Sequence, residues 1–443
     1  MSERRQDRRP YVGDVGKRPQ KASEKATATI GFVLLALVTG FVIGFAVYLL
    51  MNLSTWLTEL VWFGAAGNVP FLWYPLLVCA LGGVLIGVWT WWSHDRVRPL
   101  EEVMAEFKET GSYKTNGVWR PVVTFLLPLV FGGSIGFEAG LTGLITAGCC
   151  WIRDQIKKAG LRFGAVADVS LAASMAAIFR TPLAGIVAGV ESDPDGVALA
   201  EPDPNGYDLR RGAKAVLYTA AAFGAFGGVR AFSSLFSVSG GLPRFDSIDA
   251  SVADFLWVVP CILVAYAMTL AFYGARRAFS LVSLAIGDGT VGTIAKPTIA
   301  GVAMGAVACV LPFVLFPGEA QSEMLVEGWT SYAGATLLAT GVLKAVVTPM
   351  CIRMGWVGGD FFPSIFAGVA AGYGLAALTG ADPMLMVTVT TTAYLAGVMR
   401  KPLLVLAVLF MCFPVNGIAW MGVAAVIGAT LPVPRVLLAK SGS

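Results

Sequence analysis

Long apolar stretches separated by short polar ones run through almost the whole chain. Most are long enough to cross a bilayer as a helix, which takes about 20 residues. They lie near residues 28–50, 70–92, 117–135, 165–190, 213–235, 253–280, 297–316, 332–350, 363–378 and 384–437. They leave no room for a large soluble domain. The pattern therefore predicts an all-α polytopic membrane protein.

The composition supports a membrane protein and indicates how the chain is oriented. Hydrophobic residues make up 56% of the chain and charged residues 14%, and the mean hydropathy is +0.72. Basic residues outnumber acidic ones by eight to four before Ala26, so the positive-inside rule places this tail in the cytoplasm. No signal-peptide cleavage pattern is present, so we expect the first apolar segment to remain as a transmembrane helix in the cell membrane.

These observations predict a simple domain organisation. We expect residues 1–26 to form a basic cytoplasmic tail, residues 27–437 a single membrane domain, and residues 438–443 a short C-terminal tail. The basic tail is expected to be a solvated arm that sets topology, with lipid binding as the alternative. Membrane lipid is the expected surrounding partner, and nucleic acid is not expected.

An internal repeat divides the membrane domain. The sequence Phe179-Arg180-Thr181-Pro182-Leu183-Ala184-Gly185-Ile186 resembles Met399-Arg400-Lys401-Pro402-Leu403-Leu404-Val405-Leu406, 220 positions later. A glycine-rich break precedes each copy, at 132–143 and at 355–363. We expect a first repeat over about 27–235 and a second over about 250–437. The arginines and prolines also have a local interpretation, since proline suits the first turn of a helix and arginine reaches the membrane interface.

The first break holds the most informative residue in the chain. Glu138 lies between two strongly apolar segments, with no basic residue near it in sequence. Ionisable residues inside a membrane domain are costly and usually functional. Corresponding interrupted segments in two halves of a membrane protein indicate a substrate site between them, faced by the positive ends of helices. The expected substrate is therefore an anion.

Other chemistry finds little support in the sequence. The seven cysteines lie almost wholly in apolar segments without CxxC spacing, and His94 is the single histidine. We therefore expect no metal site, no cofactor and no enzymatic activity. An intramembrane hydrolase is a remote alternative, because His94 is poorly placed as a base and Asp360 lacks a second buried aspartate.

Four short motifs in order resemble those of the CLC chloride channels and transporters. Gly136-Phe137-Glu138-Ala139-Gly140 matches the gating motif Gly-x-Glu-x-x, and Gly359-Asp360-Phe361-Phe362-Pro363 matches Gly-x-Phe-x-Pro. The two proline-leucine stretches after the breaks are also similar. The resemblance covers roughly residues 28–437. It implies a CLC-like antiparallel, inverted-topology two-fold repeat with many tilted and re-entrant helices, assembled as a homodimer.

The resemblance also implies a site and a gate. The anion-binding residues would be Gly136, Phe137, Glu138, Gly359, Asp360 and Phe361, with the amides of Phe137, Glu138, Asp360 and Phe361 coordinating the anion. The Glu138 side chain would compete for the same place, so that its protonation or displacement opens the path. Chloride is the expected anion. Fluoride, nitrate or a small carboxylate is the alternative.

Several positions depart from the family pattern. The expected Gly-Ser-Gly-Ile-Pro motif is missing, and Asp95-Arg96-Val97-Arg98-Pro99 stands in its place. Asp360 would repel an anion unless its side chain caps a helix, turns away or acts as a second gate. An inner proton acceptor is not obvious, and the candidates for a proton pathway are Glu191, Asp193 and Glu201. The protein is accordingly expected to be either a proton-coupled exchanger or a passive channel.

Overall fold

A computed structural model describes residues 22–64, 73–93, 119–138, 140–141, 166–191, 211–236 and 241–438. The named elements within these ranges are all helical. Between the helices, Gly136 and Gly359 pair in an isolated antiparallel β-bridge. Seven of the described helices are long and apolar enough to cross a membrane. The prediction of an all-α polytopic membrane protein is confirmed.

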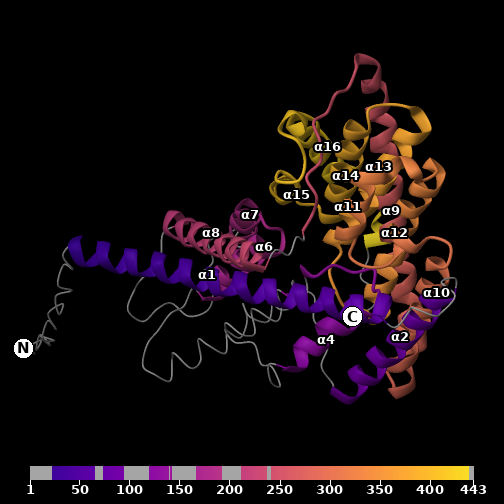
Figure 1. The fold of residues 1–443 in the computed structure, drawn as a ribbon, viewed down its shortest axis with the longest axis horizontal. Coiled ribbons are helices and arrows are strands. Elements are labelled where there is room, and N and C mark those ends of the chain that lie inside the picture. The colour runs from indigo at the N-terminus through magenta and orange to yellow at the C-terminus, as the bar shows by residue number, and fades with distance from the viewer. Residues whose placement is uncertain are drawn as a thin grey trace, which may run out of the picture.

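The first half of the chain is described in several separate ranges, and its helices lie within them. They are α1 (Ala22–Glu59), α2 (Tyr74–Ser93), α4 (Trp119–Val130), α6 (Val166–Ile178), α7 (Pro182–Glu191) and α8 (Arg211–Phe236), with a π-helical turn η1 (Leu60–Gly64) after α1. Figure 1 shows α1 extending across the molecule with α6 and α8 alongside it.

The second half is described continuously. Its helices are α9 (Val258–Ile286), α10 (Thr290–Ala308), α11 (Glu319–Gly328), α12 (Gly334–Arg353), α13 (Phe361–Thr379), α14 (Pro383–Met399), α15 (Pro402–Leu409), α16 (Ile418–Thr430) and α17 (Arg435–Leu438). Short 3-10 turns join them: η2 (Val252–Trp257), η3 (Pro312–Val314), η4 (Trp329–Ser331) and η5 (Val415–Gly417). Helices α9 and α11 to α16 gather in one bundle (Figure 1).

Helices α13 and α14 form the centre of this bundle. Nearly every residue of both helices is buried, including the polar threonines of α14. A helix that is apolar or buried all round belongs to the interior of a protein and not to its lipid surface. The N-terminus of α13, where the second glycine break ends, is therefore fixed by packing on all sides.

The internal repeat is visible in the backbone. Helix α6 ends at Ile178 and α14 at Met399, and Arg180 and Arg400 after them are both left-handed, with φ values of 51° and 57°. Each is followed by a proline that opens the next helix, α7 or α15. Arg400 also donates from Nη1 to the carbonyl oxygens of Ala429 and Leu431, both at 2.7 Å, and so closes the C-terminal end of α16. Arg400 therefore has a structural role inside the protein, and its reach to the membrane interface stays a prediction.

Small residues allow the long helices to approach closely. A Cβ atom on Gly40 or Gly44 of α1 would lie 2.1 or 2.2 Å from a backbone oxygen of α8, and one on Gly224 or Gly228 of α8 would lie 2.1 or 2.4 Å from a backbone oxygen of α1. Helices in lipid associate through such backbone contacts because lipid tails are as apolar as the side chains. The α1–α8 pair is therefore held by glycine spacing.

We expect Gly44→Ala to destabilise the protein by roughly 1–3 kcal/mol, because the new methyl group must displace a backbone. Its Cβ would lie 2.2 Å from the Ala225 carbonyl oxygen. The measurement is the thermal unfolding midpoint of detergent-solubilised protein, followed by tryptophan fluorescence. Gly31→Ala is the matched control on the same helix, since nothing lies within 4 Å of its added Cβ. Equal midpoints for the two variants would contradict the packing argument.

Candidate anion site

The first glycine break begins where α4 ends. Gly132 has a φ of 86°, and a Cβ there would lie 2.7 Å from the Trp62 ring. Gly133 donates its amide to the Pro128 carbonyl at 2.8 Å, and the Trp62 indole donates to the Val130 carbonyl at 2.9 Å. A residue with a side chain would be strained at Gly132 and would collide with Trp62. These contacts turn the chain toward Glu138.

The two breaks meet through a pair of glycines. The Gly136 amide donates to the Gly359 carbonyl at 2.7 Å, and the Gly359 amide donates to the Gly136 carbonyl at 2.9 Å. This antiparallel bridge joins the first half of the chain to the second. Both amides are used in the bridge, so these two glycines shape the site by lacking side chains.

Glu138 occupies the place where the two halves meet. Its side chain is 4% exposed, and Oε1 accepts a hydrogen bond of 2.6 Å from the amide of Phe361, the first residue of α13. A Cβ atom on Gly136 would lie 2.0 Å from Oε2, and one on Gly359 would lie 1.9 Å from Oε1. The carboxylate thus rests on two bare glycine backbones at the positive end of a helix, which is a setting suited to an anion.

The second carboxylate oxygen is left without a partner. Oε2 of Glu138 is buried and has no hydrogen bond within the described part of the chain. A buried carboxylate oxygen without a donor favours binding a proton, because an unpaired charge is costly away from water. The site therefore holds one oxygen by an amide and leaves the other available for protonation.

Phenylalanine rings enclose the site. Phe137 packs edge-on against Phe362 with centroids 5.8 Å apart, and Phe179 lies 5.1 Å from both Phe361 and Phe362. Phe179 directly follows α6 and is the first residue of the first repeat copy. The rings exclude water, which strengthens electrostatic interactions at the site. The sequence predicted no site role for Phe179, although its place at the start of the repeat copy is a signal.

Asp360 stands at the N-cap position of α13, but its side chain makes no capping hydrogen bond. The side chain is half-buried and lies within electrostatic reach of Glu138. Capping by the side chain, one of the roles expected from the sequence, is therefore absent. A role for Asp360 as an anion ligand or a second gate stays a prediction.

Of the three proton-pathway candidates, the structure describes Glu191 alone. Glu191 is the last residue of α7, and its half-buried carboxyl faces Lys401 and the backbone of Leu404 at the start of α15. The structure thus places it against the other repeat. Asp193 and Glu201 lie outside the described residues, as do His94 and the Asp95–Pro99 segment.

A fully buried lysine, Lys344, holds the turn that hydrogen-bonds to the first glycine break. The Lys344 ammonium of α12 donates to four backbone carbonyls, those of Phe313, Val314, Leu315 and Phe316, at 3.3, 3.1, 2.9 and 2.8 Å. In turn, the Phe316 amide donates to the Gly132 carbonyl at 3.1 Å. A lone lysine inside the apolar stretch 332–350 is the sequence signal from which this contact could have been predicted.

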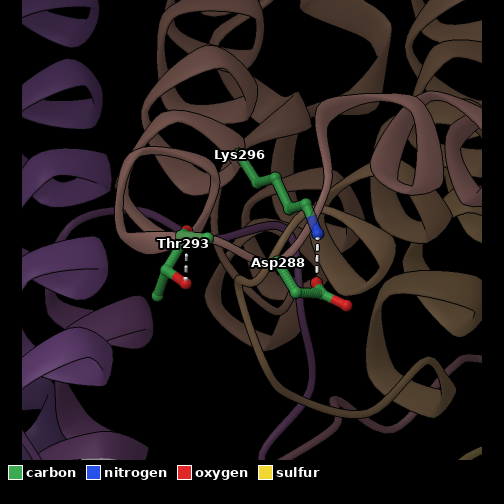
Figure 2. Close-up of polar contacts among 4 residues, drawn as sticks. Asp288, Thr293 and Lys296 are labelled. Carbon is green, nitrogen blue, oxygen red and sulfur yellow. Dashed lines mark hydrogen bonds and ion pairs between the residues drawn. The ribbon is translucent and has the colours of Figure 1, made fainter.

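A cavity of about 220 Å³ lies between α2, α4, α10 and the segment after α12. Figure 2 shows two polar contacts on its wall: Lys296 donates to Asp288 at 2.7 Å, and the Thr293 hydroxyl donates to the Gly289 carbonyl at 3.2 Å. Arg353 adds a second basic side chain. None of the described residues that contact the Glu138 carboxylate lines the cavity, but Gly355 and Val357 line it and lead directly to Gly359.

A protein-family model described as voltage gated chloride channel matches residues 97–432. The chain belongs to this family. The match spans most of the chain and includes both glycine breaks and both repeat motifs. Family membership confirms the resemblance drawn from the sequence and supports anion transport across a membrane as the class of function.

One curated relative and several solved structures are similar. The chain is 32% identical over 133 residues to chloride channel protein CLC-e of Arabidopsis thaliana, a match that covers 26% of this chain and 19% of that protein. A crystal structure of a CLC-type fluoride/proton antiporter matches with a TM-score of 0.68 and 16% identity, over 93% of this chain and 97% of that one.

Two further structures share the fold. A slow cyanobacterial Cl⁻/H⁺ antiporter matches with a TM-score of 0.65 and 15% identity, over 93% of this chain and 96% of that one. A eukaryotic CLC transporter matches with a TM-score of 0.62 and 14% identity, over 92% of this chain and 72% of that one. These matches confirm the CLC-like fold for the described helices.

We expect Lys344→Met to destabilise the protein by about 1.5–3 kcal/mol or more, because charge-assisted hydrogen bonds to buried carbonyls are lost. The thermal unfolding midpoint in detergent measures the effect. Lys401→Met is the control, since Lys401 is exposed and the substitution removes the same charge. If the two variants unfolded at the same temperature, the Lys344 contacts would contribute nothing to stability.

Proposed function

We propose that the protein moves small inorganic anions, chloride first among them, across the cell membrane, with Glu138 as the gate. The observation that carries the proposal is the seat of the Glu138 carboxylate on Gly136 and Gly359, with the Phe361 amide at 2.6 Å. A carboxylate oxygen and a halide suit the same position, because both are anions that accept from backbone amides.

Competition between carboxylate and anion provides a mechanism. While Glu138 is ionised, its Oε1 occupies the Phe361 amide. A proton on Oε2 would neutralise the side chain and weaken that bond, since hydrogen bonds to ionised acceptors are about twice as strong as neutral ones. The side chain then leaves, the amide becomes available, and an anion enters. Proton binding and anion binding are thereby linked.

The cavity between α2, α4 and α10 is the access chamber in this proposal. Lys296 and Arg353 line it, and the side chain of Lys296 is 12% exposed against 73% for its partner Asp288. A recessed chamber with excess positive charge concentrates anions near the path. Its walls include Pro128 and Gly355, which lead into the two breaks.

The transported anion, its coupling to protons, the membrane topology and the oligomeric state also belong to the proposal. The similar structures include a fluoride/proton antiporter and a Cl⁻/H⁺ antiporter, so the transported anion and its coupling to protons are the first questions. The cytoplasmic N-terminus and a homodimer with one path per subunit complete the proposal.

We expect Glu138→Gln to abolish pH dependence and any proton movement while anion flux persists, because the amide mimics the protonated acid. Purified protein is placed in liposomes loaded with potassium chloride, and chloride efflux and internal pH are recorded together after valinomycin is added. Wild-type efflux with opposed proton movement identifies an exchanger. Efflux without proton movement identifies a channel-like path.

The control for this experiment is Glu59→Gln, because Glu59 is an exposed carboxylate at the end of α1. It should match the wild type in both signals. Loss of all anion flux in a well-folded Glu138→Gln protein would argue against the gate assignment. If the wild type moves no chloride, the same assay is repeated with fluoride, nitrate and carboxylates.

We expect Lys296→Met to lower anion flux by roughly tenfold at low ionic strength and less at high salt, because charge steering is screened by ions. Asp288→Asn is the matched variant of opposite charge change and should raise flux or leave it unchanged. Both are measured by the same efflux assay at two ionic strengths. Equal flux for Lys296→Met and wild type at low salt would contradict the proposal that anions pass through this cavity.

A further inference from the structure

Three buried sulfur atoms meet close to the first glycine break. Cys79 lies on α2, Met304 on α10 and Cys351 on α12, and all three side chains are fully buried. The Cys351 Sγ lies 3.5 Å from the Met304 Sδ. Cys79 packs on α10 beside Met304, since a Cβ on Gly305 would lie 3.1 Å from the Cys79 Cβ, and its thiol is within electrostatic reach of Cys351. Three helices thus each contribute one residue to a sulfur cluster.

The donor types in this cluster favour a soft metal ion. Within the described ranges, no three His, Cys, Asp or Glu side chains are grouped so that they could hold a metal ion. A structural Zn²⁺ site takes four such ligands, so the sulfur cluster does not provide one. Two thiolates and a thioether are ligands that Cu⁺ prefers. Local spacing could not reveal this, because a CxxC pattern detects neighbouring cysteines and each helix here supplies a single sulfur.

A nearby lysine balances the charge of such a site. A Cu⁺ ion held by two thiolates carries a single net negative charge, and a buried charge is costly unless it is paired. The Lys344 ammonium lies within electrostatic reach of Cys351, on the same helix. Its positive charge therefore compensates the ion and its thiolates. The Cys309 thiol, at the end of α10, is the other described group that acts on Cys79.

We propose that the sulfur cluster of Cys79, Met304 and Cys351 is a binding site for one Cu⁺ ion. Binding breaks both S–H bonds, forms a copper–sulfur bond to each thiolate and a third to the thioether, and releases the two protons to water. No group is oxidised or reduced. The site is separate from the Glu138 carboxylate, and the inference does not rest on the function proposed above.

The bound ion links α2, α10 and α12 where they support the first break. The Cys351 sulfur faces the amide of Ser134, which lies in that break. The Ser134 hydroxyl also lies 3.2 Å from the hydroxyl of Thr348 on α12. Ile352, next to Cys351, lines the cavity of about 220 Å³, which gives the ion an approach from water. Copper therefore stabilises the scaffold that positions the first break.

The test is a titration of the purified, detergent-solubilised protein with Cu⁺ under anaerobic conditions, in competition with a coloured Cu⁺ chelator. We expect Cys79→Ser and Cys351→Ser each to weaken the binding of one ion per chain by more than about 100-fold, because even an outer-shell partner of a metal site is worth about 10–100-fold. X-ray absorption of the copper-loaded wild type should show sulfur ligands. Cu⁺ should also raise the thermal unfolding midpoint of the wild type and leave that of Cys351→Ser unchanged.

Two controls separate this site from other thiols. Cys261→Ser should keep the ion, because the Cys261 Sγ lies 3.0 Å from the Met386 Sδ but has no second thiol acting on it among the described residues. The double variant Cys149→Ser, Cys150→Ser should also keep it. These adjacent cysteines lie outside the described residues. Binding that is lost in a control and kept in Cys351→Ser would overturn the inference.

Met304→Leu nearly keeps the size of the side chain and removes the third ligand. It should weaken Cu⁺ binding by about tenfold or more, while its unfolding midpoint without copper stays close to that of the wild type. This variant and the absorption spectrum test the site even if a cysteine variant fails to fold. The inference is overturned if Cys79→Ser and Cys351→Ser bind Cu⁺ like the wild type, if Met304→Leu does, or if the bound copper has nitrogen or oxygen ligands.

Discussion

The hydrogen bond from the Phe361 amide to Glu138 is the interaction on which the rest of the site depends. It joins residues 223 positions apart and is possible only because Gly136 and Gly359 pair directly beneath the carboxylate. Two glycines without Cβ atoms let the two halves of the chain approach, and the positive end of α13 stabilises a negative charge there. Any anion at this position meets the same amide and the same bare backbone.

Each buried charge near the site is compensated in a different way. Glu138 uses one backbone amide, and Lys344 uses four backbone carbonyls. Oε2 of Glu138 has no hydrogen bond within the described residues. Fully compensated charges stabilise one arrangement, whereas an incompletely compensated acid changes its protonation state readily. Lys344 therefore belongs to the scaffold, and Glu138 is the acid on which the proposed gate depends.

Buried helices and close helix contacts hold the backbone around the site. Helices α13 and α14 are buried on all sides and hold the amide end of the site, while α1 and α8 are joined by reciprocal glycine contacts and expose large apolar side chains. The first break is tied to this scaffold by Trp62, Pro128 and Phe316 through hydrogen bonds to the backbone. In the proposed mechanism, a site built this way keeps its backbone fixed while the Glu138 side chain moves.

The sequence by itself determined the membrane class, the internal repeat, the two glycine breaks and Glu138 as the central acid. These follow from local composition and spacing, which hydrophobic periodicity and backbone sterics control. Only the tertiary structure decided that Phe361 binds Glu138 and that Lys344 holds the turn before α11. It also placed α13 and α14 inside the bundle, because hydropathy does not separate a lipid-facing surface from a buried one. These are contacts between residues far apart in the chain, and packing selects them.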